Sequence, residues 1–256
     1  MSNPITTYGL TAVPAAASAL LTETPAYPRL HAHPDPIPIT ETPIPTTSLA
    51  QRINTYARTH LPEQTYNHCL RVYHYGLAIK QYRFPFPDWA FTDETYFLAC
   101  LLHDIGTTET NIDGTRLSFE FFGGFLALRV LQQSQAIDDN DGHSGSAAIA
   151  PKEQAESVAE AIIRHQDLCQ VGKISALGQL LQLATIFDNT GSYADLVHPE
   201  TIKDVCAHFP RHHWSGCFAA TIHREIGAKP WAHTTALGEE DFPAKVLGNK
   251  LMEPYE

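Results

Sequence analysis

The 256-residue sequence predicts an all-α fold. From residue 46 onward, apolar side chains recur in successive segments at the three- and four-residue spacing of helices. Ser, Thr or Asp precedes several of these segments, where the first turn of a helix needs a side-chain acceptor. We find neither an internal repeat nor the alternation of strands and helices that builds a parallel sheet.

Residues 1–45 are predicted to form an extended arm, and residues 46–256 a helical domain with an irregular C-terminal tail. The arm holds half of the 18 prolines of the chain, and such a density excludes a continuous helix or a central strand. Disorder is the competing interpretation for part of the arm. Five apolar side chains of the arm are available to pack on the domain: Tyr8, Leu10, Leu20, Leu21 and Tyr27.

The helices of the domain are expected to follow one another through short connections. We expect caps at Thr47 or Ser48, at Asp93 and at Ser118. A polar stretch at 138–150 predicts a surface loop, and the tail is expected to be irregular from Pro230 onward. The expected helices are 49–60, a segment after Pro62 that ends near Arg83, a segment leading to His103, 119–133, 152–167, 177–188, 199–209 and 215–227.

The composition excludes several classes of function. Hydrophobic content of 43% and charged content of 18% are typical of a globular protein, and the net charge of −11 argues against binding a phosphate backbone. No run reaches the roughly 20 apolar residues of a membrane span, and no secretory signal is evident. The five cysteines are odd in number and have no CxxC spacing. We therefore expect a cytoplasmic protein that binds neither nucleic acid nor membrane.

The most informative feature is the dipeptide His103-Asp104, which directly follows an unbroken apolar run from Tyr96 to Leu102. A helix formed by that run would be buried on nearly every side, so both ionisable side chains must enter the interior or its rim. Burying a charge is costly unless it is paired or bound to a metal, and neutral imidazole and carboxylate are ordinary metal ligands. For the dipeptide alone, a His-Asp pair that caps the helix end would be the favoured interpretation.

Two further positions complete a possible ligand set. His68 shares a helix face with Val72 and Tyr75, which points it inward, and Asp188 continues the apolar stripe of the segment 177–188. Taken singly, His68 could be a core histidine and Asp188 a helix cap. With His103 and Asp104 they give the pattern H…HD…D on three helices, which predicts one metal ion held by four side chains.

This pattern resembles the HD-domain superfamily of all-α, metal-dependent hydrolases and hydratases. Further segments resemble the fungal cyanamide hydratases, and the likeness runs from about Leu49 to Met252. The segments are Phe97–Thr108, Ser118–Gly124, Glu160–Asp167, Leu183–Asn189 and Lys229–Glu239.

The resemblance implies an HD-domain helical bundle and metal-dependent hydration of cyanamide to urea, by a metal-bound hydroxide that attacks the nitrile carbon. It implies one Zn²⁺ per chain, whereas the ligand chemistry alone also admits Fe²⁺ or Mn²⁺. We expect cyanamide as the small-molecule partner, a homo-oligomer, and a role in detoxification or nitrogen supply.

Five residues are catalytic candidates beside the metal. His165 is the leading proton donor for the nitrile nitrogen, although it could be a core histidine or a further ligand. Glu120 could orient a ligand histidine or hold the substrate amino group, or lie on an exposed face. Thr107 and Thr108 could bind substrate or close the turn after the metal pair, and Asn189 is open to the same two interpretations.

Other polar residues are expected outside the site. Arg71 is expected in a salt bridge, and His233 could help to close the pocket. Six histidines are placed in loops or on surface helices: His143, His198, His208, His212, His213 and His223.

Two other functions are alternatives to the hydration of cyanamide. A nucleotide phosphohydrolase would share the metal ligands but needs cations that receive phosphate oxygens, and the chain has 17 Lys and Arg, few of them near the ligand motifs. A non-enzymatic binding module fits poorly, because no ligand position is lost.

Overall fold

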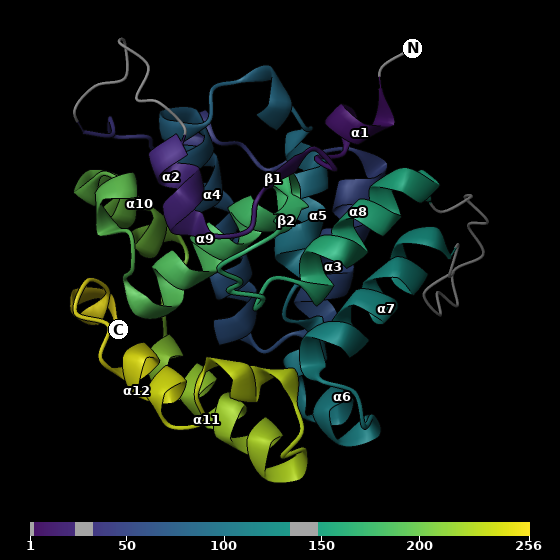
Figure 1. The fold of residues 1–256 in the computed structure, drawn as a ribbon, viewed down its shortest axis with the longest axis vertical. Helices are drawn as coiled ribbons and strands as arrows, with labels where there is room; N and C mark the ends of the chain where they lie inside the picture. Colours follow the sequence, from purple (N-terminus) through teal and green to yellow (C-terminus); the bar gives the residue numbers. More distant parts are fainter. Residues whose placement is uncertain (1–2, 24–32, 134–147) are drawn as a thin grey trace.

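A computed structural model describes residues 3–23, 33–133 and 148–256, and these residues form a helical bundle with one small sheet (Figure 1). The predicted all-α fold is confirmed. The helices and strands are α1 (Pro4–Thr7), β1 (Ala12–Pro14), α2 (Ala17–Glu23), α3 (Ser48–His60), α4 (Glu63–Arg83), α5 (Asp93–Leu102), α6 (Glu109–Gly114), α7 (Phe119–Gln132), α8 (Lys152–Ile163), β2 (Lys173–Ser175), α9 (Ala176–Thr190), α10 (Pro199–His208), α11 (Trp214–Ala228) and α12 (Asp241–Leu247).

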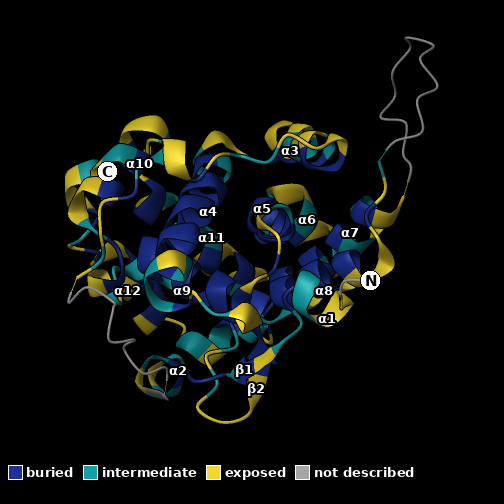
Figure 2. Cartoon of the chain, turned by 90° about the horizontal axis from the view of Figure 1, so that it is seen from above, coloured by how far each residue is buried: buried dark blue, intermediate teal, exposed yellow. Residues whose placement is uncertain are grey.

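Helices α4, α5 and α9 form the centre of the bundle, and Figure 2 shows all three as largely buried. In α5 every residue from Thr95 to Leu102 is buried, and in α4 every residue from Asn67 to Ile79. A helix that is apolar on all sides needs neighbours on all sides, and α5 accordingly packs against α3, α4, α7, α8 and α9. Ionisable groups at the end of α5 must therefore lie inside the protein.

The N-terminal segment is more regular than the extended arm that the sequence predicts. Pro4 occupies the first turn of α1, where its missing N–H is no loss, and β1 pairs antiparallel with β2, with Ala12 opposite Ser175. Val13 and Leu20 are buried in the main core. Tyr27 lies outside the described residues. The division into an arm at 1–45 and a domain at 46–256 stays a prediction.

Two of the predicted helix starts use other side chains than expected. The cap of α5 is Thr92, whose hydroxyl accepts from the backbone N–H of Thr95, and Asp93 is the first helical residue. Ser118 precedes α7, but its side chain accepts from the N–H of His233 instead of capping the helix. The carboxylate of Glu225 accepts from the N–H of Phe119 in its place.

Helix α8 ends at Ile163, earlier than the predicted Asp167. The amide of Gln182 donates to the carbonyl oxygens of Arg164 and Asp167, at 2.7 and 2.9 Å. These bonds hold residues 164–167 in a turn, so His165 lies just beyond the helix instead of on its apolar stripe.

The C-terminal region also contains more helix than the predicted irregular tail. A 3-10 turn (His233–Leu237) and α12 follow α11, and these elements form a layer at the lower edge of the molecule in Figure 1. Their apolar side chains form a second core cluster, which consists of Trp214, Phe218, Ile222, Phe242 and Val246. Phe218, Leu237 and Phe242 of this layer line the cavity of the site described below.

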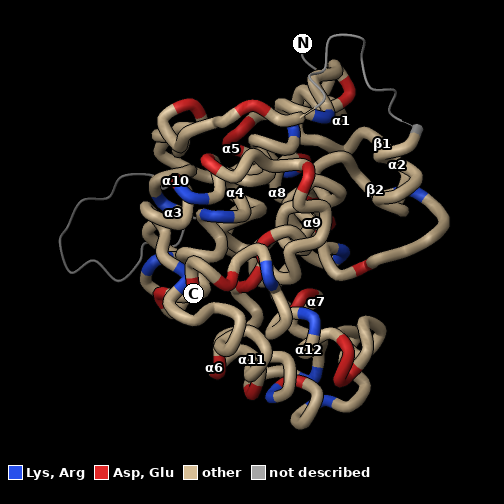
Figure 3. The backbone as a smooth tube through the Cα atoms, turned by 90° about the vertical axis from the view of Figure 1, so that its left-hand side faces the viewer, with Lys and Arg blue, Asp and Glu red and all other residues tan. Residues whose placement is uncertain are grey.

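Among the described residues, no helix is both long and apolar enough to cross a membrane. Lys and Arg are interspersed with Asp and Glu along the chain (Figure 3). The predicted polar loop lies largely outside the described residues, as does His143.

Candidate metal centre

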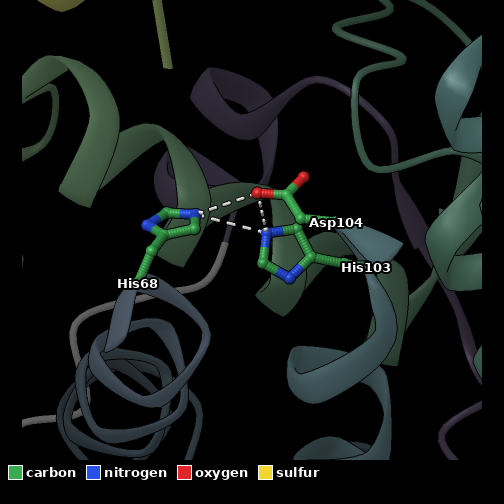
Figure 4. A group of neighbouring side chains, drawn as sticks. All are labelled: His68, His103 and Asp104. Carbon is green, nitrogen blue, oxygen red and sulfur yellow. Dashed lines mark hydrogen bonds and ion pairs between the residues drawn. The ribbon is translucent and has the colours of Figure 1, made fainter. Parts of the chain in front are cut away.

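Three buried side chains meet at the end of α5. His68 comes from α4, and His103 and Asp104 directly follow α5 (Figure 4). Atom Nε2 of His68 lies 3.2 Å from Nε2 of His103, and Asp104 Oδ2 lies 3.7 and 3.3 Å from these two nitrogens. Among the described residues, these three side chains form the group of metal-ligating residue types whose ligand atoms lie close enough together to hold a metal ion.

The outer nitrogens of the two rings fix their tautomers. His103 Nδ1 donates to the carbonyl oxygen of Cys100 at 2.8 Å, and His68 Nδ1 donates to Asp188 Oδ2 at 2.6 Å. With the ring proton on Nδ1, the neutral form of each ring directs the lone pair of Nε2 toward the other ring and toward Asp104. Three acceptors therefore converge, a geometry that requires a positive charge between them.

The carboxylate of Asp104 has the same need. Its residue is 1% exposed, and neither oxygen has a hydrogen-bond partner among the described residues. Burial works against both charged forms, yet attraction between Asp104 and His103 lowers the pKa of Asp104 to about 2 and raises that of His103 well above its ordinary value. A buried carboxylate that stays ionised needs a positive charge beside it, either a protonated histidine or a metal cation.

The distances suit a metal. Ligands about 2.0–2.1 Å from a tetrahedral ion lie about 3.3–3.4 Å from one another, close to the separations of these three atoms. Burial lowers the pKa of His68 to about 4, which keeps this ring neutral and able to coordinate near neutral pH. The residues present therefore fit a divalent ion.

Asp188, the expected fourth ligand, lies in a different environment. Besides accepting from His68, its carboxylate accepts from Arg71 Nη2 at 2.9 Å and from Arg211 Nη1 at 2.7 Å. All of these residues are fully buried. Burial raises the pKa of Asp188, but the two guanidinium groups outweigh that effect and lower it. The structure thus places Asp188 behind His68, outside the converging trio.

Arg211 reaches Asp188 from a strained turn. His212 and His213 follow it with positive φ angles of 49° and 59°, a conformation that costs about 1–3 kcal/mol for each non-glycine residue. Backbone carbonyls of the same turn, those of Phe209 and Pro210, accept from Arg71 Nη1. The turn therefore serves both arginines that hold Asp188.

A small cavity adjoins the trio. It offers about 20 Å³ to the centre of a water molecule, which is room for one or two waters. Within the described parts of the chain, its charged or titratable lining consists of His103, Asp104 and His165, without Lys or Arg. The uncharged lining residues are Gln166, Leu168, Thr185, Ile186, Asn189, Phe218, Leu237 and Phe242.

Two of the catalytic candidates line this cavity. His165 Nδ1 donates to the carbonyl oxygen of Ile162 at 2.6 Å, so Nε2 is left facing Asp104 Oδ1 at 4.0 Å. Burial, and then the neighbouring His103, lower the pKa of His165. Asn189 accepts from Trp214 Nε1 through its side-chain oxygen, at 2.8 Å.

The other three candidates lie outside the lining. Thr107 Oγ1 donates to the carbonyl of Asp104, and Thr108 Oγ1 accepts from the N–H of Asn111, so both hydroxyls close turns. Glu120 is fully buried and accepts from His233 Nδ1 at 2.8 Å, while His233 Nε2 lies 3.2 Å from Asp167. This contact docks the segment whose Leu237 lines the cavity.

Sequence reasoning missed several wall residues. Thr185 stands four residues before Asn189 on α9, so helical spacing could have identified it. Gln166 is the neighbour of His165. Trp214 stacks on the His68 ring with centroids 4.3 Å apart, and Phe218 and Phe242 come from the C-terminal layer. No local signal marks these three, because their position depends on how the chain returns to the bundle.

Comparison with known proteins agrees with this geometry. The family described as HD domain matches residues 65–190. Cyanamide hydratase DDI2 and cyanamide hydratase DDI3 of Saccharomyces cerevisiae are each 41% identical to the chain over 214 residues, which cover 84% of this chain and 88% of the relative. The protein therefore belongs to the cyanamide hydratase family of HD-domain enzymes.

Proposed function

We propose that the protein hydrates cyanamide to urea, with one zinc ion held by His68, His103 and Asp104. The observation that carries this proposal is the convergence of three acceptors on one buried point, where both Asp104 oxygens lack hydrogen-bond partners. The names of the two yeast relatives supply the substrate. Zinc comes from the family resemblance, and a homo-oligomer, a cytoplasmic location and a role in detoxification stay predictions.

The reaction adds water across the C≡N bond. A bound zinc ion lowers the pKa of a coordinated water, to about 7 in favourable sites, and so supplies a nucleophile near neutral pH. The water oxygen bonds to the nitrile carbon, one water proton goes to the nitrile nitrogen, and the resulting isourea tautomerises to urea. Nothing leaves, so the site needs only to orient the substrate and to move a proton.

His165 is suited to move that proton. Its Nε2 carries a lone pair, faces Asp104 and belongs to the cavity wall, and its lowered pKa keeps the ring neutral at neutral pH. The ring can therefore accept a proton from the water and return it to the nitrile nitrogen. Asn189 is held through its oxygen by Trp214, which leaves its amide N–H groups for the substrate.

The remaining candidates act indirectly, by positioning other residues of the site. Asp188 fixes the tautomer and orientation of His68 through Nδ1. Glu120 holds His233 and, with it, the segment that completes the cavity wall. Thr107 shapes the turn that follows Asp104, and Thr108 caps α6.

The phosphohydrolase alternative lacks its cations. A phosphate ester needs cationic groups around its oxygens, yet none of the described residues that line the cavity is Lys or Arg. The two buried arginines near the trio, Arg71 and Arg211, are both bound to Asp188. Cyanamide is neutral and needs no such groups.

The test combines metal analysis with assays of urea release from cyanamide and phosphate release from deoxynucleoside monophosphates. We expect about one zinc per chain and urea release in the wild type. In His103→Ala we expect loss of the metal and a fall in activity beyond the 10–100-fold typical of residues that only support a ligand. His223→Ala changes an exposed histidine of α11 and is the matched control. Unchanged activity in His103→Ala, or phosphate release without urea, would refute the proposal.

A further inference from the structure

A second cavity shares part of its wall with the metal centre. It offers about 370 Å³ by the same measure and is lined by residues of the segment that carries α2, of the connection 168–170 and of α9. Leu168 and Ile186 line both this outer cavity and the inner cavity at the metal centre. These two apolar side chains therefore stand between the two spaces.

The outer cavity has a mixed, uncharged wall. Gln170, Gln179, Gln182, Ser18, Ser192 and Tyr193 contribute polar groups beside alanine, leucine, isoleucine and cysteine side chains, and among the described residues no Lys, Arg, His, Asp or Glu lines it. By contrast, the cavity between the N-terminal segment and α8 is lined by Glu156, Glu160, Arg164 and Lys173. An uncharged wall costs a neutral polar molecule little desolvation, whereas a phosphate ester would lose hydration without gaining a counter-charge.

Leu168 belongs to a short connection that is fixed at both ends. At one end, Asp167 accepts from Arg164 at 3.0 Å and contacts His233. At the other, the carbonyl of Gly172 accepts from the N–H of Ala15. Between these anchors the apolar side chain of Leu168 is 44% exposed. It therefore has space to change rotamer.

We propose that the outer cavity is the route by which a small neutral substrate reaches the metal centre, and that Leu168 and Ile186 form the constriction that sets the largest substrate admitted. This inference rests on the proposed function. Specificity for cyanamide then has two sources, because the wall of the outer cavity selects neutral molecules and the constriction selects slender ones.

Substitutions at Leu168 test the constriction. Leu168→Phe should lower kcat/KM for cyanamide about 10-fold, within the range that one change of pocket size produces. Leu168→Ala should raise kcat/KM for N,N-dimethylcyanamide relative to cyanamide by about 10-fold. Val171→Phe and Val171→Ala are matched controls, because Val171 lies in the same connection, is 83% exposed and lines neither cavity. A general folding defect would lower kcat/KM for both substrates alike and leave the ratio of the two kcat/KM values unchanged.

A second measurement does not depend on urea formation. In cobalt-loaded protein, the rate at which 2-mercaptoethanol, a small neutral thiol, binds the metal can be followed by absorption. Leu168→Phe should slow this binding several-fold, and Val171→Phe should not. Equal thiol-binding rates and equal substrate ratios in the Leu168 and Val171 variants would overturn the constriction. Absence of urea release in a wild type whose thiol binding responds to Leu168→Phe would instead refute the proposed reaction alone.

Discussion

Asp104 and Asp188 are two buried aspartates of one core with opposite surroundings. Both were expected as metal ligands, both contact His68, and both are at most 1% exposed. Asp104 has no hydrogen-bond donor on either oxygen, whereas Asp188 accepts from two arginines and a histidine. The same residue type, in the same interior, is therefore under-satisfied in one place and saturated in the other.

The difference separates two ways of keeping a carboxylate in a protein interior. A saturated carboxylate has its charge balanced by the protein and can hold a neighbouring side chain in place. An unsatisfied carboxylate stores a cost that a bound cation removes. We therefore interpret Asp104 as a ligand and Asp188 as the residue that positions His68, and the following predictions test that distinction.

The largest effect is expected on stability when Asp188 is neutralised. Asp188→Asn leaves Arg71 and Arg211 buried without a full counter-charge, and breaking a buried pair in this way costs about 3–5 kcal/mol in the free energy of unfolding. Urea denaturation of the metal-free protein measures it. Asp113→Asn is the matched control, since it breaks an exposed ion pair with Arg224 and should cost less than about 1 kcal/mol. Equal losses in the two variants would show that the Asp188 network carries no special weight.

A smaller effect on stability, and a large one on activity, is expected at Asp104. In the metal-free protein Asp104→Asn should lower the free energy of unfolding by less than Asp188→Asn does, because Asp104 faces histidine rings whereas Asp188 balances two buried guanidinium groups. Urea release should nevertheless fall more than about 100-fold. A loss of stability as large as that of Asp188→Asn would mean that Asp104 is a structural residue.

The edge of the Asp188 network should respond weakly. Glu256 Oε1 accepts from Arg211 at 2.9 Å and from Ser215 at 2.5 Å, and the Glu256 side chain is 22% exposed. Glu256→Gln keeps the hydrogen-bonding shape and should cost about 1 kcal/mol, with the metal content unchanged. Thermal unfolding combined with metal analysis measures both. Loss of metal from this variant would contradict a purely supporting role for the network.

The smallest effect is expected at His233 and depends on pH. The hydrogen bond to Glu120 raises the pKa of His233 above 6.5, and Asp167 and Glu225 add to that rise. The stabilisation is therefore fully present below about pH 6.5 and disappears as the pH rises through the raised pKa. Because the ring is partly exposed, we expect about 0.5 kcal/mol or less. The unfolding free energies of wild type and His233→Gln should differ at pH 5.5 and agree at pH 9.

The proposed ligands His68, His103 and Asp104 could be predicted from the sequence because their signal is local. An unbroken apolar helix that ends in His103-Asp104 forces both side chains inward, and helical spacing turns His68 toward the core. The same reasoning showed that Asp188 needs a partner, since it continues an apolar stripe. It predicted a metal ion as that partner, whereas the structure supplies His68 and two arginines, because a cationic side chain can satisfy a buried carboxylate as a metal ion does.

The parts that could not be predicted depend on distant segments. Arg211 comes from a turn in which His212 and His213 adopt the left-handed backbone conformation. No sequence pattern predicts this turn. The wall residues Leu237 and Phe242 lie in the tail that we expected to be irregular. Ser118 was expected to cap α7, but the carboxylate of Glu225 takes that place. In each case a long-range contact replaces a local preference.

The central claim is tested most directly by the metal content of two matched variants, Asp104→Asn and Asp188→Asn, measured on the folded fraction at pH 7 by elemental analysis. We predict that Asp188→Asn retains about one metal per chain, bound about 10–100-fold more weakly, and that Asp104→Asn retains none. Loss of the metal from Asp188→Asn, together with its retention in Asp104→Asn, would contradict the account.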